Sequence, residues 1–201
     1  EEAARIALKY FDEAFVQGAE VAFAGRFAST LRRLLIEYSE RGISLEDADR
    51  GWLGCSDKIR EESAPSSLYE LSSTLLLVAV KRRRYIALHI GDGVIGVERQ
   101  TSGGVRTIKA LSLPENGEFS NETVFVTSSK AERSMRLYKG RVDSSLGNIT
   151  GFILMSDGPE ASLYHKRSRT LAPACKKLLS ACRDLSCQIA EERLDSTLRN
   201  V

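Results

Sequence analysis

The chain has 201 residues, of which 42% are hydrophobic and 28% are charged, and its formal net charge is +2. This length and composition predict one globular domain with a sizeable core. The small net charge gives no reason to expect a nucleic-acid or membrane partner. The longest unbroken apolar run, Leu75–Val80, is much shorter than the ~20 residues that cross a bilayer, and no signal peptide is recognisable at the first residues.

The cysteine pattern indicates reduced thiols. No Cys-x-x-Cys pair occurs and no histidine lies nearby, so a zinc module is not expected for the four cysteines, Cys55, Cys175, Cys182 and Cys187. Cys175 and Cys182 belong to one helical pattern, which predicts that they share a buried face. We therefore expect a cytoplasmic protein whose cysteines are structural.

The first third of the chain predicts helices. Apolar residues repeat with the 3.6-residue helical period over Ala4–Phe15 and again over Phe27–Tyr38, after which Gly42 suits a C-terminal cap. A third helix is predicted within Ala48–Ile59, although two glycines weaken its pattern. Pro65 then ends the helical region.

The chain continues as a meander of short strands, and its last stretch, Thr170–Arg199, returns to a helical pattern. The turn residues Lys81–Arg84 and Ser102–Gly104 each predict a hairpin. The predicted strands are Leu75–Val80, Tyr85–Ile90, Val94–Glu98, Val105–Lys109, Thr123–Thr127, Met135–Tyr138 and Gly151–Met155. This order is typical of an α+β fold, in which helices cover an antiparallel sheet system, and not of alternating β-α-β units.

Two of the predicted strands run into Asp-Gly, one as Gly91-Asp92-Gly93 and the other as Ser156-Asp157-Gly158. A strand packed on both faces is a rigid mount, and the carboxylate at its end can project into a cleft. The glycine that follows permits a positive φ and the close approach of a ligand. Because Mg²⁺ and Mn²⁺ prefer carboxylate oxygens together with waters, Asp92 and Asp157 are candidate metal ligands.

Each of these features also has a second interpretation. Asp-Gly after a strand is a common turn signal, chosen for backbone conformation alone. The run Lys81–Arg84 suits either a solvated hairpin turn or charge-assisted contacts with a phosphorylated or acidic partner. His89 suits either a packed strand residue or a general acid for a leaving group. Glu118 and Asn121 either line a cleft or hold their own loop by hydrogen bonds.

Four segments of the chain, in order, resemble one known family. They are Glu1–Ala7, Ser72–Gly93 with its Gly-Asp-Gly, Gly117–Phe125 and Met155–Gly158. The first, second and fourth resemble the first helix, the central hairpin and a later Ser/Thr-Asp-Gly strand end of the PP2C-type phosphatases, which are metal-dependent Ser/Thr protein phosphatases. The third is similar to a Gly-Glu-aromatic-x-Asn-x-Thr-x-Phe stretch of a bacterial subgroup of that family.

The resemblance implies a fold and a reaction. The fold would be a single PP2C-like domain over residues 1–201, with two packed antiparallel β-sheets flanked by helices. The reaction would be hydrolysis of phosphoserine and phosphothreonine in a phosphorylated protein substrate, with a cognate Ser/Thr kinase as the opposing enzyme. Two Mn²⁺ or Mg²⁺ ions would hold a bridging water that attacks phosphorus in line, so no side chain acts as the nucleophile.

The resemblance also implies roles for particular residues. Asp157 matches a direct ligand of the binuclear metal centre, and Asp92 matches a position associated with a third, more weakly held metal. Beside these two aspartates, the residues that are candidates for lining the cleft are Gly93, Gly158, Glu118 and Asn121.

Two parts of the family pattern are missing from this sequence. An N-terminal Asp-Gly, whose aspartate bridges both metals, would precede Glu1, and a C-terminal Asp-Asp would follow Val201. We therefore expect a domain that is incomplete at both ends. The alternatives are a PP2C-like pseudophosphatase, which binds a partner without turnover, and a metal-free structural domain whose Asp-Gly pairs are only turns.

Overall fold

The computed structural model describes residues 2–41, 68–114, 123–145, 147–186, 188–189 and 192. The chain divides into two compact units. The first comprises Glu1–Asp92 and Pro114–Arg141, and the second comprises Gly93–Leu113 and Val142–Val201. The predicted helix within Ala48–Ile59 lies outside the described residues.

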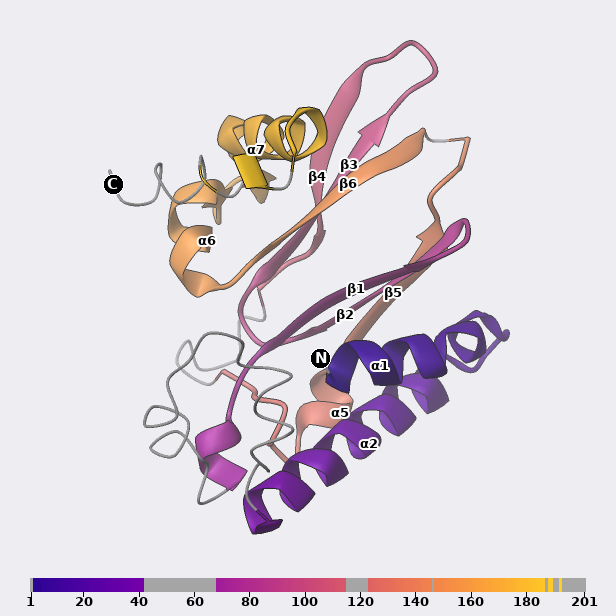
Figure 1. The fold of residues 1–201 in the computed structure, drawn as a ribbon, viewed down its shortest axis with the longest axis vertical. Helices are drawn as coiled ribbons and strands as arrows, with labels where there is room; N and C mark the ends of the chain where they lie inside the picture. The colour runs from indigo at the N-terminus through magenta and orange to yellow at the C-terminus, as the bar shows by residue number, and fades with distance from the viewer. Residues whose placement is uncertain are drawn as a thin grey trace. The chain divides into compact units, whose positions relative to one another are not determined.

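The first unit is a three-stranded antiparallel sheet with helices (Figure 1). Its elements are α1 (Glu2–Lys9), η1 (Phe11–Phe15), α2 (Glu20–Arg41), η2 (Leu68–Leu71), β1 (Leu75–Lys81), β2 (Arg84–Ile90), α5 (Ala131–Ser134) and β5 (Arg136–Arg141). The central strand is β2, which pairs with β1 on one side and with β5 on the other. The helices α1 and α2 contact each other, and they also contact β1 and β5 respectively.

The core of the first unit lies between this sheet and its helices. Alternate residues of β2, namely Ile86, Leu88 and Ile90, face this cluster and are at most 1% exposed. Phe23 and Phe27 of α2, equally buried, belong to the same cluster. Since the other side chains of β2 after Arg84 are buried too, β2 is packed on both faces, as the sequence predicts for a rigid mount.

The second unit has its own three-stranded antiparallel sheet, in which β3 is central. Its elements are β3 (Val94–Gln100), β4 (Arg106–Ser112), β6 (Asn148–Met155), α6 (Asp157–Leu163), β7 (Tyr164–His165), β8 (Thr170–Leu171) and α7 (Pro173–Asp184). The helices α6 and α7 contact β6 and each other, and β8 contacts β4. Gly96 permits this close packing, because a Cβ there would lie 2.7 Å from Ile153 Cγ2 and from Leu171 Cδ1.

One ion pair lies in the interior of the second unit. Glu98 of β3 is 0% exposed, and its Oε2 accepts hydrogen bonds from Thr150 Oγ1 at 2.5 Å and from Arg183 Nη2. Thr150 belongs to β6 and Arg183 to α7. The buried carboxylate therefore fastens α7 to two strands of the sheet.

The structure confirms the predicted α+β class, with antiparallel sheets and helices. The predicted strand Thr123–Thr127 is wrong: the segment makes a single backbone hydrogen bond to the sheet region, from Val126 N to Ser73 O, and then turns. The helical stripe Ala4–Phe15 is interrupted, since α1 ends at Lys9 and a 3₁₀ turn follows. Within the described helices, none is long and apolar enough to cross a membrane.

The predicted burial of two cysteines on one face is also wrong. Cys175 is buried, whereas Cys182 is exposed. The cluster that encloses Cys175 includes Tyr164 and Leu171, so it covers the first part of α7 and does not extend to Cys182. Cys55 and Cys187 lie outside the described residues.

Candidate functional site

The Gly91-Asp92-Gly93 segment begins directly after β2. Gly91 has a φ of +105°, and a Cβ at this position would lie 2.4 Å from Thr74 Cγ2. Both observations require glycine, because other residues rarely adopt this φ and because the side chain of Thr74, just before β1, leaves no room. Neither Gly93 nor Gly158 is among the glycines with positive φ. The prediction that the following glycine supplies the unusual conformation is therefore wrong, and the preceding glycine supplies it.

The carboxylate of Asp92 is half-buried and is held by a neutral donor. Thr123 Oγ1 donates a hydrogen bond to Asp92 Oδ2 at 3.0 Å. Thr123 belongs to the Gly117–Phe125 stretch. A hydroxyl orients the carboxylate without adding a positive charge beside it. The carboxylate oxygens of Asp92 can therefore still serve as ligands for a hard cation.

Arg136 of β5 holds the backbone just before Asp92. Its Nη2 donates to the carbonyl oxygen of Gly91 at 3.1 Å and lies 3.1 Å from His89 Nδ1. This contact follows from the register of the sheet, in which His89 pairs directly with Arg136. The guanidinium therefore fixes the backbone at the end of β2, which presents the Asp92 carboxylate.

His89 is a packed, neutral histidine. It is 0% exposed, and a guanidinium can only donate, so Nδ1 must accept and the proton resides on Nε2. Burial, together with the smaller effect of the Arg136 charge, lowers the pKa of His89 from 6.5 to about 3. Of the two roles that the sequence left open, a packed strand residue fits these observations, because a proton donor must carry its proton near neutral pH.

This lowered pKa predicts acid sensitivity. Since the folded pKa lies below the unfolded value of 6.5, the stability contributed by the neutral ring is complete above pH 6.5 and is lost as the pH falls toward 3, by about 1.4 kcal/mol per pH unit. We expect His89→Asn, which cannot take up this proton, to lose less unfolding free energy than the wild type between pH 7 and pH 5. Urea unfolding at the two pH values measures the difference, and His165→Asn, at an exposed position, is the control. Equal losses in the wild type and His89→Asn would contradict the assignment.

Asp157 lies in the second unit and is the first residue of α6. Its side chain is exposed, and no hydrogen bond or ion pair joins it to the described part of the chain. A Cβ on Gly158 would meet no atom within 4 Å, so the backbone beside Asp157 is open to a ligand. The Asp-Gly pair here starts a helix, whereas the simpler interpretation predicts a turn.

Both aspartates offer the donor chemistry of a Mg²⁺ or Mn²⁺ ligand. Each presents carboxylate oxygen, and such ions are commonly held by one or two carboxylates together with waters. Among the described residues, no group of three or more His, Cys, Asp or Glu side chains gathers into a metal site. Asp92 and Asp157 belong to different units. Glu118 and Asn121, predicted to line the cleft, lie outside the described residues.

Two contacts of Asp92 and its backbone are not predicted by the local sequence pattern around it. Thr123 stands in the Asn-x-Thr pattern of the Gly117–Phe125 stretch, so the resemblance contained a signal for it. Arg136 had no such signal, because its contact with Gly91 depends on which strand lies beside β2.

Comparison with known proteins identifies one family. The family model described as Protein phosphatase 2C matches residues 1–199. No curated protein and no solved structure matches the chain. The matched range contains both Asp-Gly pairs and the buried strand β2.

Proposed function

This chain belongs to the protein phosphatase 2C family, and we propose that it is a metal-dependent protein Ser/Thr phosphatase. The proposed substrates are proteins that carry phosphoserine or phosphothreonine. The observation that carries the proposal is the family match over residues 1–199. The fixed carboxylate at the end of β2 adds support, because metal-dependent hydrolysis needs preorganised oxygen ligands.

We assign the metal-holding role to Asp157 and Asp92, each with Mn²⁺ or Mg²⁺ as its ion. Asp157 offers an exposed carboxylate at the start of α6, beside the open backbone of Gly158. Asp92 offers a carboxylate that Thr123 orients by a hydrogen bond. When bound, such ions supply Lewis acidity that activates water and stabilises charge on the phosphoryl oxygens. No side chain is assigned the role of nucleophile.

The resemblance of Gly117–Phe125 to a bacterial subgroup extends the proposal. The protein would work in the cytoplasm of a bacterial cell and would reverse the action of a Ser/Thr kinase. The bacterial origin and the kinase rest on this resemblance alone.

Metal removal tests the proposed function. We expect the protein to hydrolyse a phosphothreonine peptide in the presence of Mn²⁺, to lose this activity to background after EDTA treatment, and to regain it on readdition of Mn²⁺. Phosphate release is the measurement, with Ca²⁺ as the control ion, because Ca²⁺ prefers six to eight ligands and a more flexible geometry. Turnover that survives EDTA would contradict the metal dependence. Metal binding without turnover would identify a pseudophosphatase.

A further inference from the structure

A cluster of cations surrounds the tip of the β1–β2 hairpin. Five cationic side chains and one carboxylate line a surface pocket of about 420 Å³, and they are Asp12, Lys81, Arg82, Arg83, Arg84 and Arg141. All of them belong to the first unit. The hairpin-tip pocket, as we call this group, has room for a few anionic groups and an excess of positive charge that attracts them.

The register of the sheet places three of these cations side by side. Lys81 of β1 pairs directly with Arg84 of β2, and Arg84 pairs directly with Arg141 of β5. Directly opposed residues have Cβ atoms about 4.5–5.5 Å apart, and like charges at such positions repel one another. Three adjacent strands therefore carry the same sign of charge in one row, an arrangement that an anion would relieve.

The turn that joins the two strands brings in two further cations. Arg82 has a φ of 57°, a left-handed conformation that glycine or asparagine adopts more easily than arginine. Arg82 and Arg83 are both exposed. Glycine or asparagine at position 82 would make the turn with less backbone strain. Backbone geometry therefore does not explain the arginine there.

The row of cations is partly fixed before any ligand arrives. Arg84 lies over the ring of Phe15, 4.9 Å from its centroid, and Lys81 lies 5.8 Å from the centroid of Phe11. Lys81 Nζ also contacts Asp12 Oδ2 at 2.6 Å. The hydrogen bond from Lys81 lowers the pKa of Asp12, and the positive charges of Lys81, Arg82 and Arg84 lower it further. The pocket therefore already stabilises one ionised carboxylate of this chain, that of Asp12.

We propose that the hairpin-tip pocket binds an acidic segment of a protein partner through its carboxylate side chains. Arginine forks hold carboxylates by paired charge-assisted hydrogen bonds, and four of the five cations are arginines. Asp12 illustrates this preference for carboxylates, because its own carboxylate binds Lys81 at one edge of the pocket. A long uniform polyanion fits less well, because the net charge of the whole chain is only +2 and the cations of the pocket form one local cluster.

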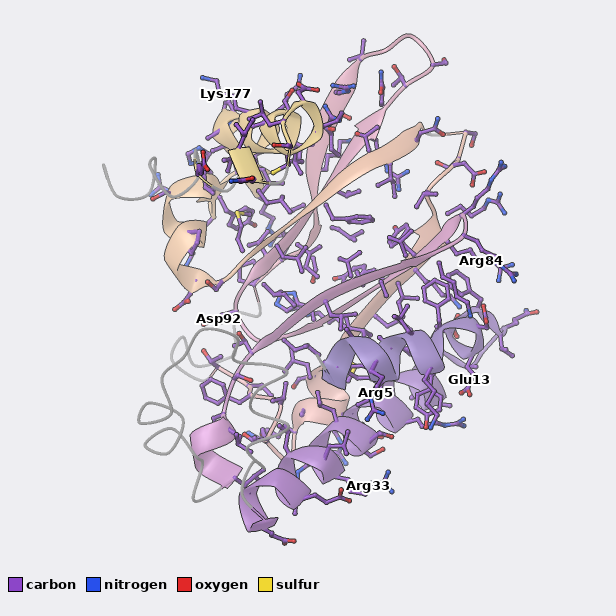
Figure 2. The ribbon with its side chains drawn as sticks, viewed as in Figure 1. Arg5, Glu13, Arg33, Arg84, Asp92 and Lys177 are labelled. Atoms are coloured by element: carbon purple, nitrogen blue, oxygen red, sulfur yellow. The ribbon has the colours of Figure 1, made fainter. Side chains whose placement is uncertain are left out.

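The pocket is remote from Asp92. Figure 2 shows Arg84 and Asp92 at opposite ends of the β1–β2 hairpin. Seven residues lie between them, and the strand β2 from Arg84 to Ile90 alone spans about 20 Å at the usual rise per residue. The proposed binding therefore requires neither metal nor hydrolysis, and it stands or falls separately from the proposed phosphatase activity.

Binding of a fluorescently labelled acidic peptide tests the proposal. The peptide consists of Asp, Glu and Ser residues without phosphate, and its fluorescence anisotropy is measured in a buffer that contains EDTA. We expect Arg82→Asn/Arg83→Ser to weaken binding by at least about tenfold, because it removes two charge-assisted contacts. The control Lys176→Gln/Lys177→Gln removes two exposed charges from α7 and should bind like the wild type. Asparagine suits the φ at position 82, so the thermal midpoint should be unchanged or higher, which a melting curve verifies.

Competition identifies the class of ligand. A peptide of the same length with Asn and Gln in place of Asp and Glu should not compete, whereas excess unlabelled acidic peptide should. Equal weakening in the two double variants, or no binding of the acidic peptide to the wild type, would overturn the proposal. So would a duplex DNA or an anionic phosphatidylserine vesicle that binds in an Arg82- and Arg83-dependent manner where the peptide does not.

Discussion

Replacing Asp157 by asparagine is expected to lower metal-dependent turnover of a phosphopeptide by about a thousandfold and to leave the fold intact. The first effect follows because the amide lacks the charge with which a carboxylate holds a divalent ion, and metal-ion catalysis contributes several kcal/mol. The second follows from its position. Asp157 is exposed at the first residue of α6, so the substitution leaves no buried group without a partner. Steady-state kinetics with Mn²⁺ and urea unfolding measure the two quantities.

The matched control is Asp184→Asn. Asp184 is also exposed, lies in the same unit and accepts a hydrogen bond from Ser180 within α7. The Asp184→Asn variant loses the same charge as Asp157→Asn, and it should retain turnover close to that of the wild type. If Asp157→Asn and Asp184→Asn were equally active, the assignment of Asp157 as a metal ligand would be wrong. A partial loss that high Mn²⁺ restores would support it, since a weakened ligand set lowers metal affinity.

Replacing Arg183 by methionine is expected to reduce the free energy of unfolding by about 3–5 kcal/mol. The reason is the environment of its partner. Glu98 is completely buried on β3, and without Arg183 the hydroxyl of Thr150 is the remaining side-chain donor to its carboxylate in the described part of the chain. Removing one member of a buried pair leaves an uncompensated charge in the interior, which costs more than the pair itself contributes. Urea unfolding at constant pH, followed by circular dichroism, measures the change.

A double replacement separates the ion pair from simple packing. Glu98→Leu combined with Arg183→Met removes both charges and keeps most of the volume, so we expect it to recover most of the stability that Arg183→Met loses. Additive losses in the double variant would show that packing around α7, and not the orphaned charge, dominates. Arg33→Met, at a side chain that is 71% exposed on α2, is the control and should change stability by less than about 0.5 kcal/mol.

Local patterns predicted most of the fold. The strand β2 was predicted because a short apolar run followed a basic turn, and α2 because its apolar residues repeat with the helical period. The segment Thr123–Thr127 has the β-branched composition of a strand, yet strand formation depends on a neighbour to complete the hydrogen-bonded ladder. Among the described residues, a single backbone hydrogen bond links this segment to the residues before β1, from Val126 to Ser73, and no local pattern contains that information.

For the candidate site, the sequence predicted the position of Asp92 but not the contacts that hold it. The position of Asp92 after a buried strand follows from the sequence, because a chain turns where its apolar run ends. Its hydrogen bond with Thr123 joins positions 31 residues apart, and the contact between Arg136 and Gly91 joins positions 45 apart. Such contacts depend on strand order and register, which a single sequence does not determine. The left-handed conformation of Gly91 was assigned to the wrong glycine for the same reason, since the crowding by Thr74 is a tertiary contact.

The division of the chain between the two units affects how the protein is made. The chain leaves the first unit after Asp92, returns at Pro114 and leaves again after Arg141. During synthesis the hairpin of β1 and β2 emerges early, but β5, which completes its sheet, emerges only after β3 and β4 of the other unit. Neither unit can therefore be separated by one cut in the chain, and a nascent chain must keep the unfinished edge of β2 from pairing with other strands until β5 arrives.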